Sequence, residues 1–394
     1  MISWFKRRCA PNMILVAVLP FLVASTAGCK PTPWPLWNAY ATRFINADGR
    51  VIDPSRGSIT TSEGQSYAMF FALVDNDRGT FDKLLAWTQN NLAGGDMSRH
   101  LPGWMWGKAS DGSWRLLDAG PAADSDCWIA YSLIEAGRLW QHKPYTDLGR
   151  AMLAMISAQE VSDLPGFGPM LMPGPSENFI HNTISTVNPS YVPLFLFERF
   201  AAVDPAGPWN EVAADIPKLI AQSSRGGFAM DWANYVPGKG FTPASGAGPA
   251  APGTTAPTPV GSYDAIRVYL WAGMVNSAVK TRPALLESLS GMATYLANHG
   301  APPEKVSDQG VPLAQDGPVG FSAAVLPYLA GRKGMQRAVS AQRARIVAAH
   351  VAGTGLYGSD PAYYDQNLVL FGTGFADGRF SFSPGGELKV EWTH

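Results

Sequence analysis

The feature that most limits the fold of this chain is an alternation of two kinds of segment, repeated six times. Segments of the first kind open with small or polar residues and continue into a long aromatic and aliphatic run. Because a helix that is apolar on every side has to be buried, these runs predict six inner helices. Their openings lie at Glu63, Asp124, Asn188, Tyr263, Pro318 and Tyr363.

Segments of the second kind are amphipathic, with apolar residues at helical spacing and charged residues on the opposite face. They predict six half-exposed outer helices, one before each inner helix. Their ranges are 34–45, 81–92, 145–160, 208–223, 283–299 and 332–350.

Six inner and six outer helices fit an all-α double ring, with the apolar set inside and the polar openings gathered at one end. Short segments at 103–106 and 379–382 predict small β-hairpins at that cleft end. Residues 30–394 are expected to form a single domain. The stretch 237–261 is rich in Gly, Pro, Ala and Thr, so we expect a long surface loop there.

The first 29 residues have the pattern of a secretory signal peptide. Basic residues at 6–8 precede an apolar run of 15 residues, 13–27, which is too short to span a bilayer comfortably. Small residues follow, and Cys29 ends a weak match to a lipoprotein box. We therefore expect a periplasmic or secreted protein with no membrane span, and lipid tethering at Cys29 as the weaker alternative.

Charge and residue spacing exclude several functions. Lys and Arg total 30 against 31 for Asp and Glu, so the chain lacks the basic surplus that nucleic-acid binding requires. The 6 His residues are scattered without metal-ligand spacing. We expect no metal and no cofactor.

Carboxylates at the helix openings, accompanied by aromatic residues, indicate glycoside cleavage. This chemistry needs one protonated carboxyl group as an acid and a second, ionised one as base or nucleophile. The carboxylates are Glu63, Asp124, Asp126 and Asp264, and the candidates for sugar stacking are Trp104, Trp106, Trp128 and Trp232.

Each carboxylate also has a purely structural interpretation. Acidic residues at helix starts commonly act as caps, and Asp264 and Arg267 have the i, i+3 spacing of a salt bridge. A helix start lowers a carboxyl pKa, so Glu63 needs burial or a neighbouring carboxylate, such as Asp124 or Asp126, to serve as an acid.

Four ordered blocks of sequence resemble glycoside hydrolase family 8. The segment 124–133, ending at Trp140, resembles the family signature, and 62–69, 188–191 and 263–267 resemble its other blocks. Within the family, the segments 302–306, 317–324 and 363–366 make the chain most similar to the periplasmic endoglucanases encoded with bacterial cellulose synthase.

The resemblance implies an (α/α)6 barrel and an inverting endo-β-1,4-glucanase acting on cellulose. It implies that Glu63 is the general acid, that Asp264 is the general base, and that Asp124 holds and distorts the sugar. Arg267 and Tyr191 are expected to orient the base, the water or the substrate, and Asp126 is a further substrate-binding candidate. An inverting pair of carboxyl groups should lie roughly 6.5–9.5 Å apart, against about 5 Å for a retaining pair.

Other functions stay open at this point. The same scaffold could act on chitosan, xylan or mixed-linkage glucan, or serve as a non-catalytic glucan-binding part of the cellulose export machinery. A transient association with cellulose synthase is expected from the resemblance. A polysaccharide lyase is disfavoured because the chain shows no cluster of a Tyr or His base with positive charge.

Overall fold

The computed structural model describes residues 33–246 and 258–393. The predicted signal peptide, Cys29 and part of the predicted 237–261 loop lie outside the described residues. Within the described ranges, no helix is both long and apolar enough to cross a membrane.

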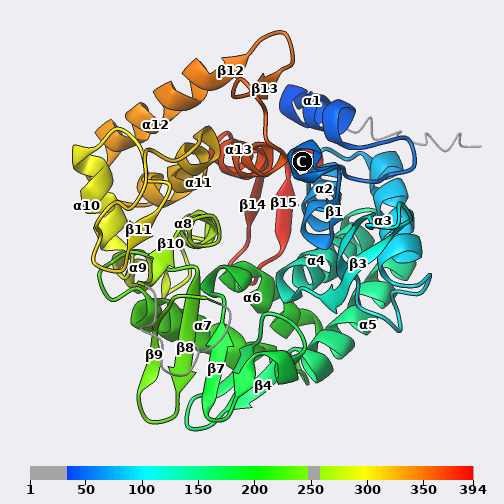
Figure 1. The fold of residues 1–394 in the computed structure, drawn as a ribbon, viewed down its shortest axis with the longest axis horizontal. Helices are drawn as coiled ribbons and strands as arrows, with labels where there is room; N and C mark the ends of the chain where they lie inside the picture. The colour runs from blue at the N-terminus through cyan, green and yellow to red at the C-terminus, as the bar shows by residue number, and fades with distance from the viewer. Residues whose placement is uncertain (1–32, 247–257, 394) are drawn as a thin grey trace, which may run out of the picture.

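Six inner helices surround the axis of the molecule, as the apolar runs predicted (Figure 1). They are almost wholly buried because aliphatic and aromatic residues occupy every side of each helix. The inner helices are α2 (Ser62–Val74), α4 (Ala123–Leu139), α6 (Leu194–Val203), α8 (Ala265–Met274), α11 (Val319–Ala330) and α13 (Tyr363–Ala376).

The outer helices form a second ring around them (Figure 1). They are α1 (Pro35–Phe44), α3 (Arg78–Leu92), α5 (Lys143–Gln159), α7 (Trp209–Ser223), the pair α9 (Arg282–Glu287) and α10 (Ser290–Asn298), and α12 (Gln336–Ala349). The expected helix at 283–299 is therefore two helices. The third inner helix also starts later than expected, because Pro189 begins a 3-10 turn, Pro189–Tyr191, and Pro193 precedes the helix proper.

One end of the double ring carries most of the strands. β1 (Thr60–Thr61), β2 (Gly103–Lys108) and β3 (Trp114–Pro121) form one antiparallel sheet. The second sheet consists of β6 (Ile180–His181), β7 (Ile184–Val187), β8 (Trp232–Val236) and β9 (Gly240–Ala244). β9 corrects the prediction that all of 237–261 is loop, because Gly240–Ala244 pairs along β8.

Shorter strand pairs connect the remaining segments. They are β4 (Val161–Leu164) with β5 (Gly168–Leu171), β10 (Val260–Gly261) with β11 (Val306–Ser307), and β12 (His350–Val351) with β13 (Leu356–Tyr357).

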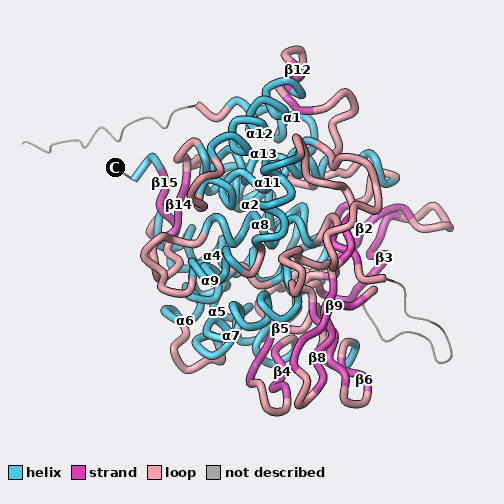
Figure 2. Tube along the Cα trace, turned by 90° about the vertical axis from the view of Figure 1, so that its left-hand side faces the viewer, coloured by secondary structure: helices cyan, strands magenta, loops and turns pink. Residues whose placement is uncertain are grey.

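The hairpin of β14 (Phe380–Phe382) and β15 (Leu388–Val390) lies at the opposite end, which corrects the prediction that it borders the cleft (Figure 2). The hairpin follows directly after α13. Because α13 begins at the cleft and runs along the barrel, its C-terminus and the hairpin lie at the far end. Buried Glu135 on α4 fixes this hairpin by accepting hydrogen bonds from the backbone N–H of Leu388 (2.8 Å) and from Arg199 (2.7 Å).

Candidate active site

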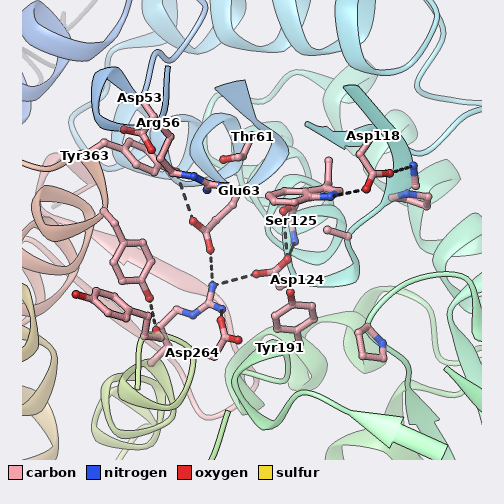
Figure 3. Close-up of a pocket in the computed structure, with 18 of the residues that line it drawn as sticks. Asp53, Arg56, Thr61, Glu63, Asp118, Asp124, Ser125, Tyr191, Asp264 and Tyr363 are labelled. Atoms are coloured by element: carbon pink, nitrogen blue, oxygen red, sulfur yellow. Dashed lines mark hydrogen bonds and ion pairs between the residues drawn. The ribbon is translucent and has the colours of Figure 1, made fainter. Parts of the chain in front are cut away.

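A cavity of about 730 Å3 opens at the N-terminal ends of inner helices, and residues of β2, β3 and β8 contribute to its lining. Glu63, Asp124, Asp264 and Tyr191 line it (Figure 3). Arg267 is also among its lining residues. The predicted openings at Glu63, Asp124, Tyr263 and Tyr363 therefore converge on one cleft, whereas the opening at Pro318 does not line it.

Arg267 joins three carboxylates that come from three inner helices. Its side chain is only 2% exposed. Nη1 donates to Glu63 Oε2 at 2.6 Å and to Asp124 Oδ2 at 3.0 Å, and Nη2 donates to Asp264 Oδ1 at 2.7 Å. Nη1 also lies 2.9 Å from the hydroxyl oxygen of Tyr67, which the sequence analysis did not single out. One buried guanidinium thus fixes the relative positions of all three acids.

Glu63 is held in a partly dry environment at the first turn of α2. Thr61 caps this helix by accepting the N–H of Gly64 at 3.1 Å, so the carboxyl group of Glu63 is left to face the cleft. Its side chain is 22% exposed. Burial raises the pKa of Glu63 to about 7 against the lowering effect of Arg267, and the neighbouring Asp124 and Asp264 add to the rise.

Asp264 is the residue immediately before α8, and Arg267 follows it by three residues. The second carboxylate oxygen of Asp264 accepts a hydrogen bond from Asn188 Nδ2 at 3.0 Å. With 31% of its side chain exposed, Asp264 is the most open of the three carboxylates. Asp231, which the sequence analysis missed, supports this turn: its carboxylate accepts the N–H groups of Ser262 and Ala265, both at 2.8 Å.

Asp124 is almost fully buried at the start of α4. It accepts hydrogen bonds from the backbone N–H and the hydroxyl of Ser125, at 2.7 and 3.2 Å, in addition to that from Arg267. Burial raises the pKa of Asp124, while Arg267 and the Ser125 N–H oppose the rise.

Two tyrosines complete the wall around these acids. The ring of Tyr191 lies 5.6 Å from the guanidinium carbon of Arg267, as a cation–π partner. The hydroxyl of Tyr363 lies 3.4 Å from Glu63 Oε1. Tyr363 was identified only as a helix opening, because its contact with Glu63 spans almost the whole chain.

The structure separates the four predicted stacking tryptophans. Trp104 and Trp232 line the cleft, and Trp104 is oriented by an N–H donation to Asp118 Oδ2 at 3.0 Å. Trp106 lies outside the cleft lining and stacks on Trp114.

Trp128 and Asp126 correct the sequence prediction of substrate contact. Trp128 is 1% exposed and packs against Phe70 and Phe371 in the barrel core. Asp126 is fully buried and lies beside Glu160, away from the cleft, because residues two apart on a helix point in nearly opposite directions.

No set of three or more His, Cys, Asp or Glu side chains within the described ranges is arranged to hold a metal ion. The three carboxylates around Arg267 are already occupied by its N–H groups.

A double ring of helices with a carboxylate cluster and indole faces at one end defines a glycoside hydrolase of the helical-barrel class. The chain belongs to the glycosyl hydrolases of family 8, whose sequence profile matches residues 2–378.

Similar proteins support the family assignment along the whole chain. An endoglucanase of Xanthomonas axonopodis pv. citri is 44% identical, covering 96% of this chain and 94% of its own. An endoglucanase of Escherichia coli O157:H7 is 42% identical over 97% of this chain and 95% of its own. The crystal structure of an endo-1,4-D-glucanase from Vibrio fischeri ES114 superimposes with a TM-score of 0.81 at 36% identity, covering 92% of this chain and all of that one. The match to this solved structure and to the family profile agrees with the (α/α)6 barrel of the present chain.

Proposed function

We propose that this protein is an endo-β-1,4-glucanase that cleaves internal bonds of cellulose with inversion at the anomeric carbon. The observation that carries the proposal is the cluster in which Arg267 binds Glu63 and Asp264 through different nitrogens of one guanidinium. Two carboxyl groups with different surroundings are thereby held in a fixed relation, as acid–base cleavage of a glycosidic bond requires.

Glu63 is assigned the role of general acid. With a pKa of about 7 it carries its proton in neutral and mildly acidic solution, and so has one to donate to the leaving glycosidic oxygen. The number of N–H groups on Arg267 also favours a protonated Glu63. Nη1 has two hydrogens but faces three acceptors, on Glu63, Tyr67 and Asp124. Protonation of Glu63 relieves this excess and frees its O–H for the substrate.

Asp264 is assigned the role of general base. It is the most open of the three acids, so a water molecule has access to it from the cleft. Arg267 and Asn188 each donate a hydrogen bond to one of its oxygens, which fixes the plane of the carboxylate. The remaining lone pairs are available to accept a proton from the attacking water.

Asp124 and Tyr191 are assigned to holding the sugar next to the cleaved bond. Asp124 is oriented on three sides by Ser125 and Arg267, which suits a group that binds sugar hydroxyls in a single geometry. Trp104 and Trp232 supply the flat apolar faces on which neighbouring glucose rings stack.

Location and partners are part of the proposal. The signal-peptide pattern in residues 1–29 supports export to the periplasm or beyond. The resemblance of 302–306, 317–324 and 363–366 to synthase-linked endoglucanases supports a role in cellulose production, with transient association with the synthase. Lipid tethering at Cys29 is the weaker alternative.

The proposal is tested with purified mature protein on carboxymethylcellulose, by following viscosity and reducing ends together. The parent should lower the viscosity quickly while few new ends appear, because internal cuts shorten chains most. Glu63→Gln should keep the fold and lose activity by roughly 10²–10⁴-fold, since an amide cannot donate the acid proton. Glu211→Gln, an exposed change on outer helix α7, is the matched control and should match the parent.

Full activity in Glu63→Gln would remove Glu63 from the mechanism. An inactive parent would shift the assignment to chitosan, xylan or mixed-linkage glucan if one of these is cleaved. It would shift to a glucan-binding protein if cellulose is bound and no glycan is cut.

A further inference from the structure

A pair of tryptophans on the β2–β3 hairpin lies outside the cleft and has no role in the mechanism above. Trp106 and Trp114 stack with ring centroids 5.1 Å apart and planes 23° from parallel. Trp114 is 47% exposed, although burying an indole is strongly favourable. Adjacent apolar rings left open at a surface are typical of a contact site.

The two rings are rigidly supported from beneath. The guanidinium carbon of Arg50 lies 4.5 Å from the centroid of Trp106 and 4.8 Å from that of Trp114. Arg50 is itself buried, and it donates to Thr60 Oγ1 at 2.8 Å and to the carbonyl of Ser58. Trp87 of α3 packs edge-on against Trp106 at 5.4 Å. A platform fixed in this way loses little side-chain entropy when a ligand binds.

The platform and the cleft share strand β2, whose pairing with β3 is irregular between Gly103 and Trp106. Trp104, which lines the cleft, comes two residues before Trp106 on β2. Trp114 begins β3 and pairs with Lys108 at the outer end of the hairpin. Indole rings therefore follow the hairpin outward from the cleft, in the order Trp104, Trp106 and Trp114.

We propose that the Trp106–Trp114 pair is an outer platform for a glucan chain that extends beyond the cleft. The occupant is the continuing β-1,4-glucan, because its glucose rings present the apolar faces that stack on indole, and the platform prolongs the surface that Trp104 begins. The inference rests on the proposed function and adds to it: the platform gives preference for long chains over oligosaccharides that fill only the cleft.

A purely structural role for Trp114 makes a different prediction. If the ring only covers Arg50, its removal should lower stability and affect substrates of all lengths alike. If the ring binds glucan, its removal should affect only substrates long enough to reach it. Chain length is therefore the variable that separates the two roles.

The test compares Trp114→Ala, Trp114→Phe and the parent on carboxymethylcellulose and on cellotetraose. We expect Trp114→Ala to raise KM for the polymer roughly three- to tenfold at an unchanged kcat, with no change on cellotetraose. Trp114→Phe, which keeps an aromatic face, should be intermediate. Val347→Ala, an exposed apolar change on α12, is the matched control and should equal the parent.

A second measurement separates the two proposals. Binding to swollen cellulose is measured in the inactive Glu63→Gln background, with and without Trp114→Ala. Weaker binding of the double variant supports the platform. If the parent cleaves cellulose but Trp114→Ala changes neither the KM for the polymer nor the binding to cellulose, the platform alone would be overturned. A parent that neither cleaves nor binds cellulose would overturn the proposed function itself.

Discussion

Arg267 is the residue on which the charge state of the cleft depends. Three carboxylates share one guanidinium, so the cluster carries excess negative charge, and a proton on one acid reduces that excess. Burial makes that excess costly, and Glu63 relieves it, with its pKa raised to about 7.

The raised pKa predicts the pH dependence of hydrolysis. Because the acid must be protonated, kcat/KM should fall as the pH rises through about 7, by close to tenfold per pH unit beyond it. The measurement is a pH–rate profile on a soluble glucan. A profile that stays flat to pH 9 would show that Glu63 is not the proton donor.

Asp126 and Glu160 form a second buried acid pair behind the cleft. Both side chains are fully buried, and none of their four oxygens receives an N–H or O–H donor among the described residues. The two carboxyl groups can form a hydrogen bond with each other only if a proton lies between them. Burial raises the pKa of Glu160 to about 8, with Asp126 and Asp124 as the facing acids.

This pair predicts a pH-dependent stability. Between pH 4.5, the ordinary pKa, and about 8, unfolding releases the proton that folded Glu160 retains, so the free energy of unfolding falls as the pH rises. Glu160→Gln should gain stability over the parent in this window, by roughly 1.4 kcal/mol for each pH unit above 4.5. Urea unfolding at pH 5 and pH 8 measures it, with Glu211→Gln as control. If the free energy of unfolding changed by the same amount between pH 5 and pH 8 in the parent and the variant, the result would contradict the shared proton.

Sequence identified the three cleft acids because each opens an apolar helix, but it did not tell which face of the helix meets the cleft. Asp126 follows Asp124 by about 200° around α4 and so points away. Trp128 is on the same face as Asp124 but one turn deeper, in the core. Asp231 and Tyr67 lacked any local signal, because their partners lie on other elements.

At the scale of elements, the turn before α8 positions both the proposed base and the arginine. Asp231 holds that turn from the preceding strand region by accepting two backbone N–H groups and the hydroxyl of Ser262. The positions of Asp264 and Arg267 therefore depend on Asp231, whose side chain hydrogen-bonds to Ser262 and Ala265 in the same turn.

Removing this support should disturb catalysis without touching the cleft acids. Asp231→Ala is expected to cost about 1–2 kcal/mol of stability, as the loss of a helix cap does, and to lower kcat more than it raises KM. Steady-state kinetics and thermal unfolding measure the two effects. Asp163→Ala, an exposed change on β4, is the control, and kinetics unchanged in Asp231→Ala would refute the positioning role.

The helices were more predictable than the strands at this scale. A buried helix needs a long apolar run, which is visible in sequence, and all six inner helices follow such runs. β9 and β14 are only five and three residues long, and their partners and location depend on tertiary contacts. The hairpin at 380–390 accordingly appeared at the opposite end of the barrel.

At the scale of the whole molecule, the ring of helices was predictable because the alternation of buried and amphipathic segments leaves few ways to bury the apolar runs. One continuous apolar core extends from Trp34 to Val390. We infer from this continuity that the described part of the chain, residues 33–246 and 258–393, acts as a single domain, in line with the expectation for 30–394.

A single domain predicts one cooperative unfolding transition. Tryptophan fluorescence and far-UV circular dichroism should report the same midpoint, because the inner helices share their core. Two separated transitions would show that part of the barrel unfolds independently.

The central claim is that Glu63 and Asp264 act as the acid and base of an inverting glucanase. Its most direct test is proton NMR of the first sugar ends released from a cello-oligosaccharide, recorded before the anomers equilibrate. We predict that the α-anomer appears first, because water attacks opposite the leaving group when the carboxyl groups leave room for it. Initial release of the β-anomer would establish retention and contradict the assignment of Asp264 as the base.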